Sequence, residues 1–245
     1  MSARAQAGFL SKSWALARKD LRIEYRARET LLPMIAFAFA VTLLLSFALP
    51  GEADLQAPVR VPPIGTVPMP DVLSGFLWVT VLFAGLIGFA RTFEAERDEG
   101  AIDSILLLPL DRTGVWLGKA LANLSFIVAI ELFVIPLFAL LFGFRLGSSW
   151  AVLVGVVALV DVGFVAVGTL FASVAAQTRS RELILPILAL PALVPLFIAA
   201  VELCAQIFVG RTVATVAGSG WFGILVASDV IFIAVCALAF EFVID

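Results

Sequence analysis

The sequence predicts an all-α polytopic membrane protein with six transmembrane helices. Of the 245 residues, 62% are hydrophobic and only 14% are charged, a balance far from that of a soluble domain. The apolar residues form six long runs, each reaching about the 20 residues that a helix needs to cross the hydrocarbon core. In lipid every backbone N–H and C=O needs a partner within the protein, so helices are expected. The runs are Leu31–Leu49, Val72–Ala90, Leu121–Phe144, Ala151–Ala176, Leu183–Val209 and Trp221–Phe242.

Residues 1–30 precede the first run and are predicted to form a basic amphipathic helix at the membrane interface. Their apolar residues recur at helical spacing, with lysines and arginines largely elsewhere, and an aromatic pair suits the headgroup region. The alternative is a solvated basic leader that only sets topology. The stripe consists of Leu10, Trp14, Ala17, Leu21 and Tyr25.

The basic residues also predict the orientation. With the N-terminus in the cytoplasm, all Lys and Arg except Arg60, Arg145 and Arg211 fall on the cytoplasmic side. Both termini are therefore expected to be cytoplasmic. The Pro-rich stretch 50–70 is expected to be an extended outer loop.

The fifth run carries three prolines, which remove backbone hydrogen bonds. We expect a kinked helix, or a broken one whose outer part folds back together with Arg211–Gly220 as a re-entrant element. The prolines are Pro186, Pro191 and Pro195.

The segment Arg91–Lys119 is heavily charged although it lies between two spans. Thr92–Leu108 is predicted to be an amphipathic helix, acidic early and apolar late, that ends at Pro109. Asp111 or Thr113 can then cap a new helix leading into the third span. Such a segment is either a lever at the cytoplasmic face or only a surface connector.

Catalytic chemistry has little support. The chain has no histidine, which excludes Ser/His/Asp and Cys/His sets and removes the commonest metal ligand. A glycine-rich phosphate loop and a basic face for nucleic acid are also missing, so neither ATP nor nucleic acid is expected to bind this chain alone. Cys204 and Cys236 are expected to be packing residues, since helical rise would separate them by roughly 15 Å.

Four acids lie within the predicted spans, where an ionisable group is costly. They suggest a polar lining for a translocation path or a proton relay. Equally, each could be a neutral acid that hydrogen-bonds a neighbouring helix, or could lie nearer an interface. The four are Glu131, Asp161, Glu202 and Asp229.

The segment FEAERDEGAIDSILLLPLDR, followed by Gly118–Lys119 and Asn123, resembles the cytoplasmic coupling loop of ABC-2-type permeases. With the leader ARKDLRIEYRARE, the six spans and the LLLPLDR turn, the whole chain resembles the CcmB family, the haem-exporter permease of cytochrome c maturation.

The resemblance implies an ABC-2-type permease bundle in residues 31–245 and a multi-pass location in the bacterial inner membrane. It implies a transporter subunit rather than an enzyme, acting as a homodimer within a complex. The implied partners are an ABC ATPase subunit that binds ATP, further membrane subunits of cytochrome c maturation and a periplasmic haem chaperone. Haem is then a possible cargo, and no cofactor is expected to be bound directly.

The resemblance also implies that the loop 91–119 receives work from the ATPase. The residues expected to couple are Phe93, Glu96, Glu99, Gly100 and Pro109, unless they form only an acidic solvated face. Two other functions stay open. One is an ABC-2 permease for a lipid, polysaccharide or drug, and the other is a proton-coupled secondary carrier that uses the buried acids.

Overall fold

The computed structural model describes residues 8–49, 58–61, 65–93, 112–143, 149–178 and 181–243. Within these ranges six helices are long and apolar enough to span a membrane, which confirms the predicted all-α polytopic fold. They are α2 (Leu31–Ala48), α3 (Met69–Arg91), α6 (Arg112–Phe142), α7 (Trp150–Ala176), α8 (Arg181–Phe208) and α10 (Gly220–Val243).

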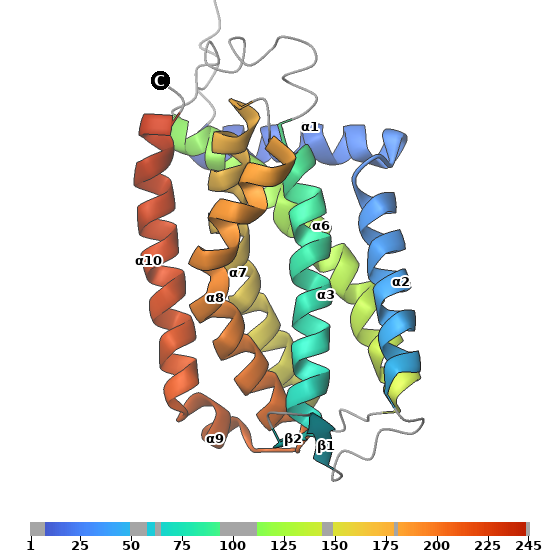
Figure 1. Ribbon diagram of the computed structural model, residues 1–245. Coiled ribbons are helices and arrows are strands. Elements are labelled where there is room, and N and C mark those ends of the chain that lie inside the picture. Colours follow the sequence, from blue (N-terminus) through green and yellow to red (C-terminus); the bar gives the residue numbers. More distant parts are fainter. Residues whose placement is uncertain are drawn as a thin grey trace, which may run out of the picture.

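The six long helices run side by side, and a seventh helix, α1 (Phe9–Ala27), lies across one end of the bundle (Figure 1). We call this the α1 end. The opposite end carries the short helix α9 (Val213–Ala217) and an antiparallel hairpin of β1 (Pro58–Val61) and β2 (Gly65–Pro68), and we call it the hairpin end. The stretch predicted to be an extended outer loop thus contains paired strands.

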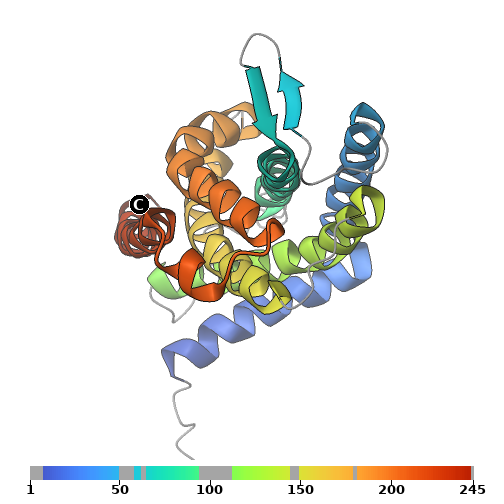
Figure 2. The same cartoon turned by 90° about the horizontal axis from the view of Figure 1, so that it is seen from below.

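The centre of the bundle is formed by α3 and α7, in each of which 61% of the apolar window is buried. The helices α2 and α10 stand on opposite sides, as the view along the bundle shows (Figure 2), and only 17% of each window is buried. Their exposed apolar faces suit contact with lipid.

Aromatic rings hold α3, α7 and α8 together. Phe164 of α7 lies edge-on against Phe89 of α3 and Phe197 of α8, with ring centroids 5.0 and 5.1 Å apart. Gly168 makes room for this packing, because a Cβ atom there would collide with the Phe89 ring. Edge-to-face aromatic pairs contribute stabilisation beyond that from the apolar area that the rings bury.

Helix α8 is unbroken from Arg181 to Phe208 although it contains three prolines. The alternative of a broken fifth span is therefore wrong. Residues 211–220 do not re-enter the bundle but form a connection at the hairpin end that includes α9 (Figure 1).

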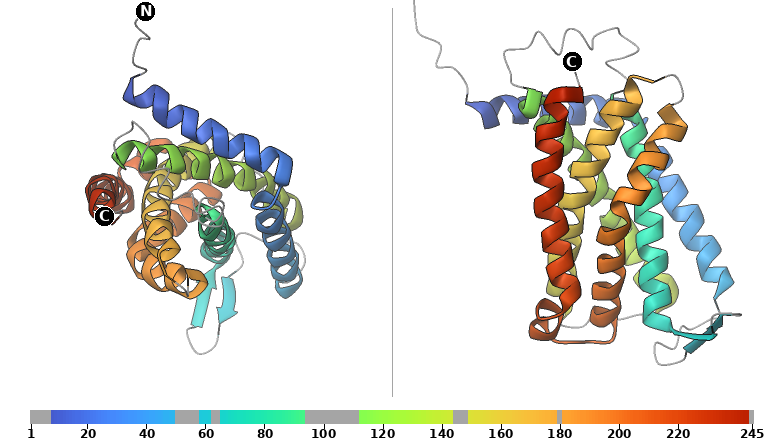
Figure 3. Two further views of the ribbon diagram at one scale, coloured as in Figure 1. Left: turned by 90° about the horizontal axis from the view of Figure 1, so that it is seen from above. Right: turned by 60° about the vertical axis from the view of Figure 1, so that its left-hand side comes forward.

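Helix α1 packs along α6, and the view from the α1 end shows the two side by side (Figure 3). Leu16 and Ala17 are buried, whereas Leu10, Trp14 and Tyr25 are 71%, 54% and 81% exposed. Ala17 therefore belongs to the face toward the bundle and not to the exposed stripe. The apolar residues of α1 divide between a bundle-facing side and an exposed side, because helical faces repeat every 3.6 residues.

A tight turn joins α1 to α2. Arg28 adopts the left-handed conformation (φ 55°) and its N–H caps α1 by bonding the Glu24 carbonyl oxygen. The Glu24 carboxylate then accepts hydrogen bonds from the N–H groups of Thr30 and Leu31 at 2.9 and 2.7 Å. One residue thus ends α1 and satisfies N–H groups at the start of α2.

Candidate functional site

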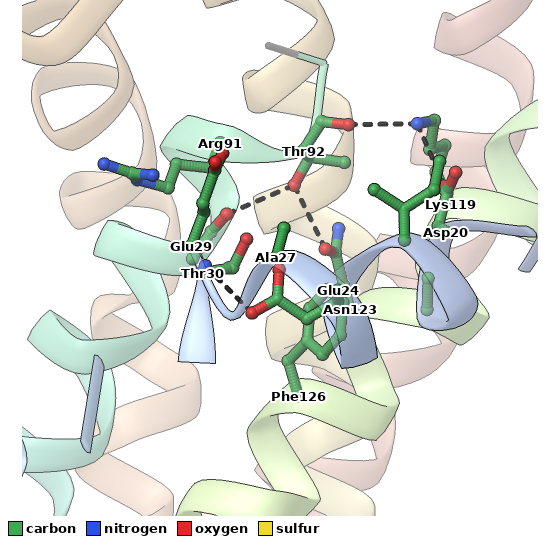
Figure 4. Close-up of a pocket in the computed structure, with 13 residues that line it drawn as sticks. Asp20, Glu24, Ala27, Glu29, Thr30, Arg91, Thr92, Lys119, Asn123 and Phe126 are labelled. Atoms are coloured by element: carbon green, nitrogen blue, oxygen red, sulfur yellow. Dashed lines mark hydrogen bonds and ion pairs between the residues drawn. The ribbon is translucent and has the colours of Figure 1, made fainter. Parts of the chain in front are cut away.

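A cluster of polar side chains lies at the α1 end, where α1, α3 and α6 meet (Figure 4). We call Asp20, Thr92, Lys119 and Asn123 the Lys119 cluster. Lys119 is only 2% exposed, and its ammonium group lies 3.0 Å from the Asp20 carboxylate. It also donates a hydrogen bond to the Thr92 carbonyl oxygen at 3.0 Å. A buried lysine charge is tolerable here because it is both paired and hydrogen-bonded.

The cluster extends toward the middle of the bundle through Asn123. The Thr92 hydroxyl donates to Asn123 Oδ1 at 3.0 Å, and Asn123 Nδ2 donates to the Thr169 hydroxyl at 2.9 Å. Asn123 and Thr169 are 2% and 0% exposed. These bonds connect the cap of α3 through α6 to α7, beside the ion pair that joins α1 and α6.

The glycine before Lys119 allows α1 to approach α6. A Cβ atom at Gly118 would lie 2.9 Å from the Ser13 carbonyl oxygen and 2.9 Å from Leu16. Such distances are too short for any other residue unless the helices move apart. The sequence pattern Gly118–Lys119 thus has a physical meaning: close contact with α1, then a charge aimed at Asp20.

The cluster connects both sides of the predicted lever. Thr92 stands at the end of α3, and Lys119 lies in the first turns of α6, with residues 94–111 between them in sequence. The helix that the sequence predicts after Pro109 is confirmed by α6, which begins at Arg112.

Of the five predicted coupling residues, the structure describes only Phe93. It is 8% exposed, and the Lys119 ammonium lies 5.2 Å from the centroid of its ring. This cation–π contact adds a further partner to the buried charge. Glu96, Glu99, Gly100 and Pro109 lie outside the described residues.

Two of the four intramembrane acids lie together. Glu131 on α6 and Asp161 on α7 are 4% and 2% exposed, and their carboxyl groups interact with each other. Both lie roughly 16 Å from the hairpin end of their helices, at a rise of 1.5 Å per residue. Glu131 Oε1 and Asp161 Oδ1 have no hydrogen-bond partner among the described residues.

The other two acids are placed differently. Asp229 on α10 is 5% exposed and its carboxyl group lies against Gly163 of α7, where a Cβ atom would collide with it. Glu202 is half-buried and lines a groove between α3 and α8, beside Trp78 and Phe197. The four acids therefore do not form one cluster.

The cysteines are free and buried, as predicted. The indole N–H of Trp78 donates a hydrogen bond to Cys204 Sγ at 3.2 Å, which links α3 to α8. Within the described part of the chain, no three His, Cys, Asp or Glu residues are placed to hold a metal ion.

Sequence reasoning noticed Gly118, Lys119 and Asn123 only as a pattern, and it missed Asp20, Thr92 and Thr169. One observation pointed toward the Asp20–Lys119 ion pair. A lysine at the start of a long apolar run needs an acid nearby, and α1 carries few acids that could serve. Its partner could not be chosen from spacing alone, because Lys119 and Asp20 are far apart in sequence.

Comparison with known proteins points to one family. The family model described as CcmB protein matches residues 11–245. A heme exporter protein B from Rhodobacter capsulatus is 28% identical over 193 residues, which cover 77% of this chain and 80% of that protein. One from Bradyrhizobium diazoefficiens is 28% identical over 203 residues, 80% of this chain and 82% of that protein. One from Escherichia coli is 29% identical over 110 residues, 45% and 44% of the two chains.

Proposed function

The chain belongs to the CcmB protein family, and from this membership we propose that it is the membrane permease subunit of an ABC-type complex that exports haem for cytochrome c maturation. The observation that carries the proposal is the family match over almost the whole chain, together with relatives named heme exporter protein B. The six apolar helices support a multi-pass permease.

In this proposal ATP is bound and hydrolysed by a separate subunit, and two copies of the permease work together with further membrane subunits and a periplasmic haem chaperone. Haem is cargo and not a resident cofactor. The α1 end faces the cytoplasm of a bacterium, and α1 lies in the inner leaflet interface of the inner membrane. The basic residues of residues 1–30 and the exposed Trp14 and Tyr25 support this orientation.

Work from the ATPase enters through the coupling loop 91–119. Glu96, Glu99 and Gly100 contact the partner, and Pro109 separates the lever from α6. The Lys119 cluster supports this role, because it ties Thr92, at the start of the coupling loop, to α6 at its end. A push on the lever is then shared by α1, α3 and α6, since a buried, multiply bonded charge resists separation from its partners.

Phe93 acts from within the bundle. Its buried ring lies beside the Lys119 ammonium and positions the cluster rather than touching the ATPase. We assign it to the transmission of movement.

The buried acids form the polar part of the transport path. Glu131 and Asp161 supply its central pair, and Asp229 and Glu202 lie nearer the hairpin end of their helices. Glu131, Asp161 and Asp229 are buried without basic partners among the described residues, which supports a functional role because such groups are expensive in a bilayer. A haem-handling path suits this family better than the carrier alternative.

The proposal is tested by co-expression with a candidate ATPase subunit, pull-down in mild detergent and an assay of cytochrome c maturation. Glu99→Lys reverses a charge at the proposed contact, and Gly100→Pro would break the interior of the predicted helix Thr92–Leu108 at a cost of about 3 kcal/mol or more. Each is expected to leave the protein inserted but to uncouple ATP hydrolysis from maturation. Glu52→Lys, in the stretch predicted to lie outside, is the matched control. Normal maturation and normal ATPase retention in both variants would reduce the loop to a connector.

A further inference from the structure

A cavity of about 300 Å³ opens beside the Lys119 cluster, between α1, the α1–α2 turn, the end of α3 and α6. This volume lies at the lower end of the range for small-molecule sites, roughly 300–1,000 Å³. Its walls carry charged groups of both signs and an apolar part that includes Ile23 and Phe126. Figure 4 shows Asp20 and Lys119 on one side of this region, and Arg91 and Glu29 on the other.

The charges in the walls are not balanced. Asp20 and Lys119 neutralise each other as a pair. Among the lining residues that the structure describes, the acids are Asp20, Glu24 and Glu29 and the bases are Lys119 and Arg91, so this part of the wall has one more carboxylate than cation. A site of this kind favours a ligand with a positive group rather than a simple anion.

Glu24 gives the more specific indication. The residue is only 7% exposed, and one carboxylate oxygen, Oε1, accepts both hydrogen bonds from the Thr30 and Leu31 N–H groups at the start of α2. Its second oxygen, Oε2, accepts no hydrogen bond from the residues that the structure describes. Glu29 likewise makes no ion pair within those residues. Oε2 is not among the buried side-chain oxygens without a partner, so it is accessible and can bond a donor that enters the cavity. A charged donor binds a carboxylate best.

Arg91 supplies the opposite charge on the far wall. A guanidinium has five N–H donors and can bind a phosphate in addition to its other contacts. The cavity lies at the level of α1, which is the headgroup region in the membrane placement proposed above. Phosphate and ammonium groups are both abundant at that depth.

We propose that this cavity binds a primary ammonium group carried on a phosphate ester, with the ammonium at Glu24 and Glu29 and the phosphate toward Arg91. Two sources carry this chemistry: the headgroup of an ethanolamine phospholipid, and free phosphoethanolamine. The inference rests on the interfacial placement of α1 given under the proposed function, but it does not depend on haem as the cargo. A bound zwitterion would join the α1–α2 turn to the end of α3 beside the Lys119 cluster.

The test is native mass spectrometry of the purified protein, titrated with three phospholipids that have identical acyl chains. Phosphatidylethanolamine carries the ammonium, phosphatidylcholine replaces it with a quaternary group that cannot donate, and phosphatidylglycerol lacks a positive group. We expect the ethanolamine lipid to be retained about tenfold more strongly than either other lipid, as one charge-assisted hydrogen bond predicts. Soluble phosphoethanolamine, added as a competitor, distinguishes the sources: strong competition assigns the site to the free ligand, and weak competition to the lipid.

Two variants locate the effect. Glu24→Gln keeps the oxygen that caps α2 and removes the charge, and Glu29→Gln removes the exposed carboxylate. Both are expected to abolish the preference for ethanolamine at an unchanged melting temperature, whereas Asp71→Asn at the hairpin end retains it. Equal retention of the three lipids, or a preference that survives both variants, would overturn the proposal. Since no ATPase or haem is needed, failure here is separable from failure of the transport proposal.

Discussion

The ammonium group of Lys119 lies 3.0 Å from both the Asp20 carboxylate and the Thr92 carbonyl oxygen, and so joins α6 to α1 and to the residue that caps α3. The same Asp20 also pairs with Lys19 at 3.2 Å, but Lys19 is 46% exposed whereas Lys119 is 2% exposed. One acid thus makes a surface pair and a buried pair.

Lys119→Met is predicted to destabilise the protein and to impair transport. It leaves Asp20 and the Thr92 carbonyl without their buried donor, at a cost of about 3 kcal/mol, the lower end of the range for breaking a buried pair. The melting temperature of the purified protein and cytochrome c maturation measure the two effects. Lys19→Met is the control and should cost at most about 1 kcal/mol. Equal effects from the two variants would remove the special role of Lys119.

Gly118→Ala is predicted to loosen α1 from α6. The added methyl would meet the Ser13 carbonyl oxygen at 2.9 Å, and backbone cannot yield as a flexible side chain can. Overpacking of this kind costs about 1–3 kcal/mol. Gly155→Ala on α7 is the matched control, because its methyl would meet nothing within 4 Å. Thermal melting in detergent decides between them, and a Gly118→Ala protein as stable as the control would contradict the close contact.

Glu131→Gln is predicted to keep the fold and to lower transport by about tenfold or more. An amide preserves the shape and a donor toward Asp161, but it cannot take up or release a proton. Glu131→Leu, which removes the polar group altogether, separates polarity from protonation. If Glu131→Gln supports normal maturation while Glu131→Leu lowers the melting temperature, the pair is a structural contact and not part of the path.

Single cysteines test the orientation in intact cells with a membrane-impermeant thiol reagent. The background is Cys204→Ser and Cys236→Ala, where serine keeps an acceptor for the Trp78 N–H. A cysteine at Thr66 in the hairpin is predicted to react, and one at Ser11 on α1 to be protected until the cells are opened. Labelling of the Ser11 site in intact cells would show that the α1 end lies outside the cytoplasm, where the coupling loop could not contact a cytoplasmic ATPase.

The purified subunit is predicted to bind no haem stoichiometrically. Haem iron is usually held by His, Met, Cys or Tyr, and this chain has no His. Met34 and Cys204 are buried in packed contacts, while Tyr25 is exposed on α1. The absorption spectrum after haem-replete expression is the measurement. A Soret band at one haem per subunit, lost on replacement of Met34, Met69 or Tyr25, would restore direct binding.

The spans were predictable because their cause is local. A run of apolar residues must be helical in lipid wherever it lies in the fold, and the six predicted runs match the six helices closely. The apolar run that begins at Leu121 is only part of α6, because the helix predicted after Pro109 begins at Arg112 and continues into it. Apolar composition alone excluded Lys119 from the span, whereas Asp20 and Thr92 allow its charge to be buried.

The three prolines of α8 led to a wrong alternative, a broken fifth span. Each removes one backbone hydrogen bond, which suggested a possible break, but in the structure packing against α3 and α7 accompanies a continuous helix. Neighbouring helices can supply the order that the lost bonds do not. The sequence carries the prolines but not the surfaces that surround them.

By itself, the sequence determined the membrane class, the six spans, the basic helix before them and the charged segment between the second and third spans, since each follows from composition or periodicity over a short stretch. Only the tertiary structure decided that Asp20 meets Lys119, that Glu131 meets Asp161 while Glu202 stands elsewhere, and that Glu24 lines a cavity. Such pairs join residues on different helices, and their partners are selected by how the helices pack, for which no local pattern carries information.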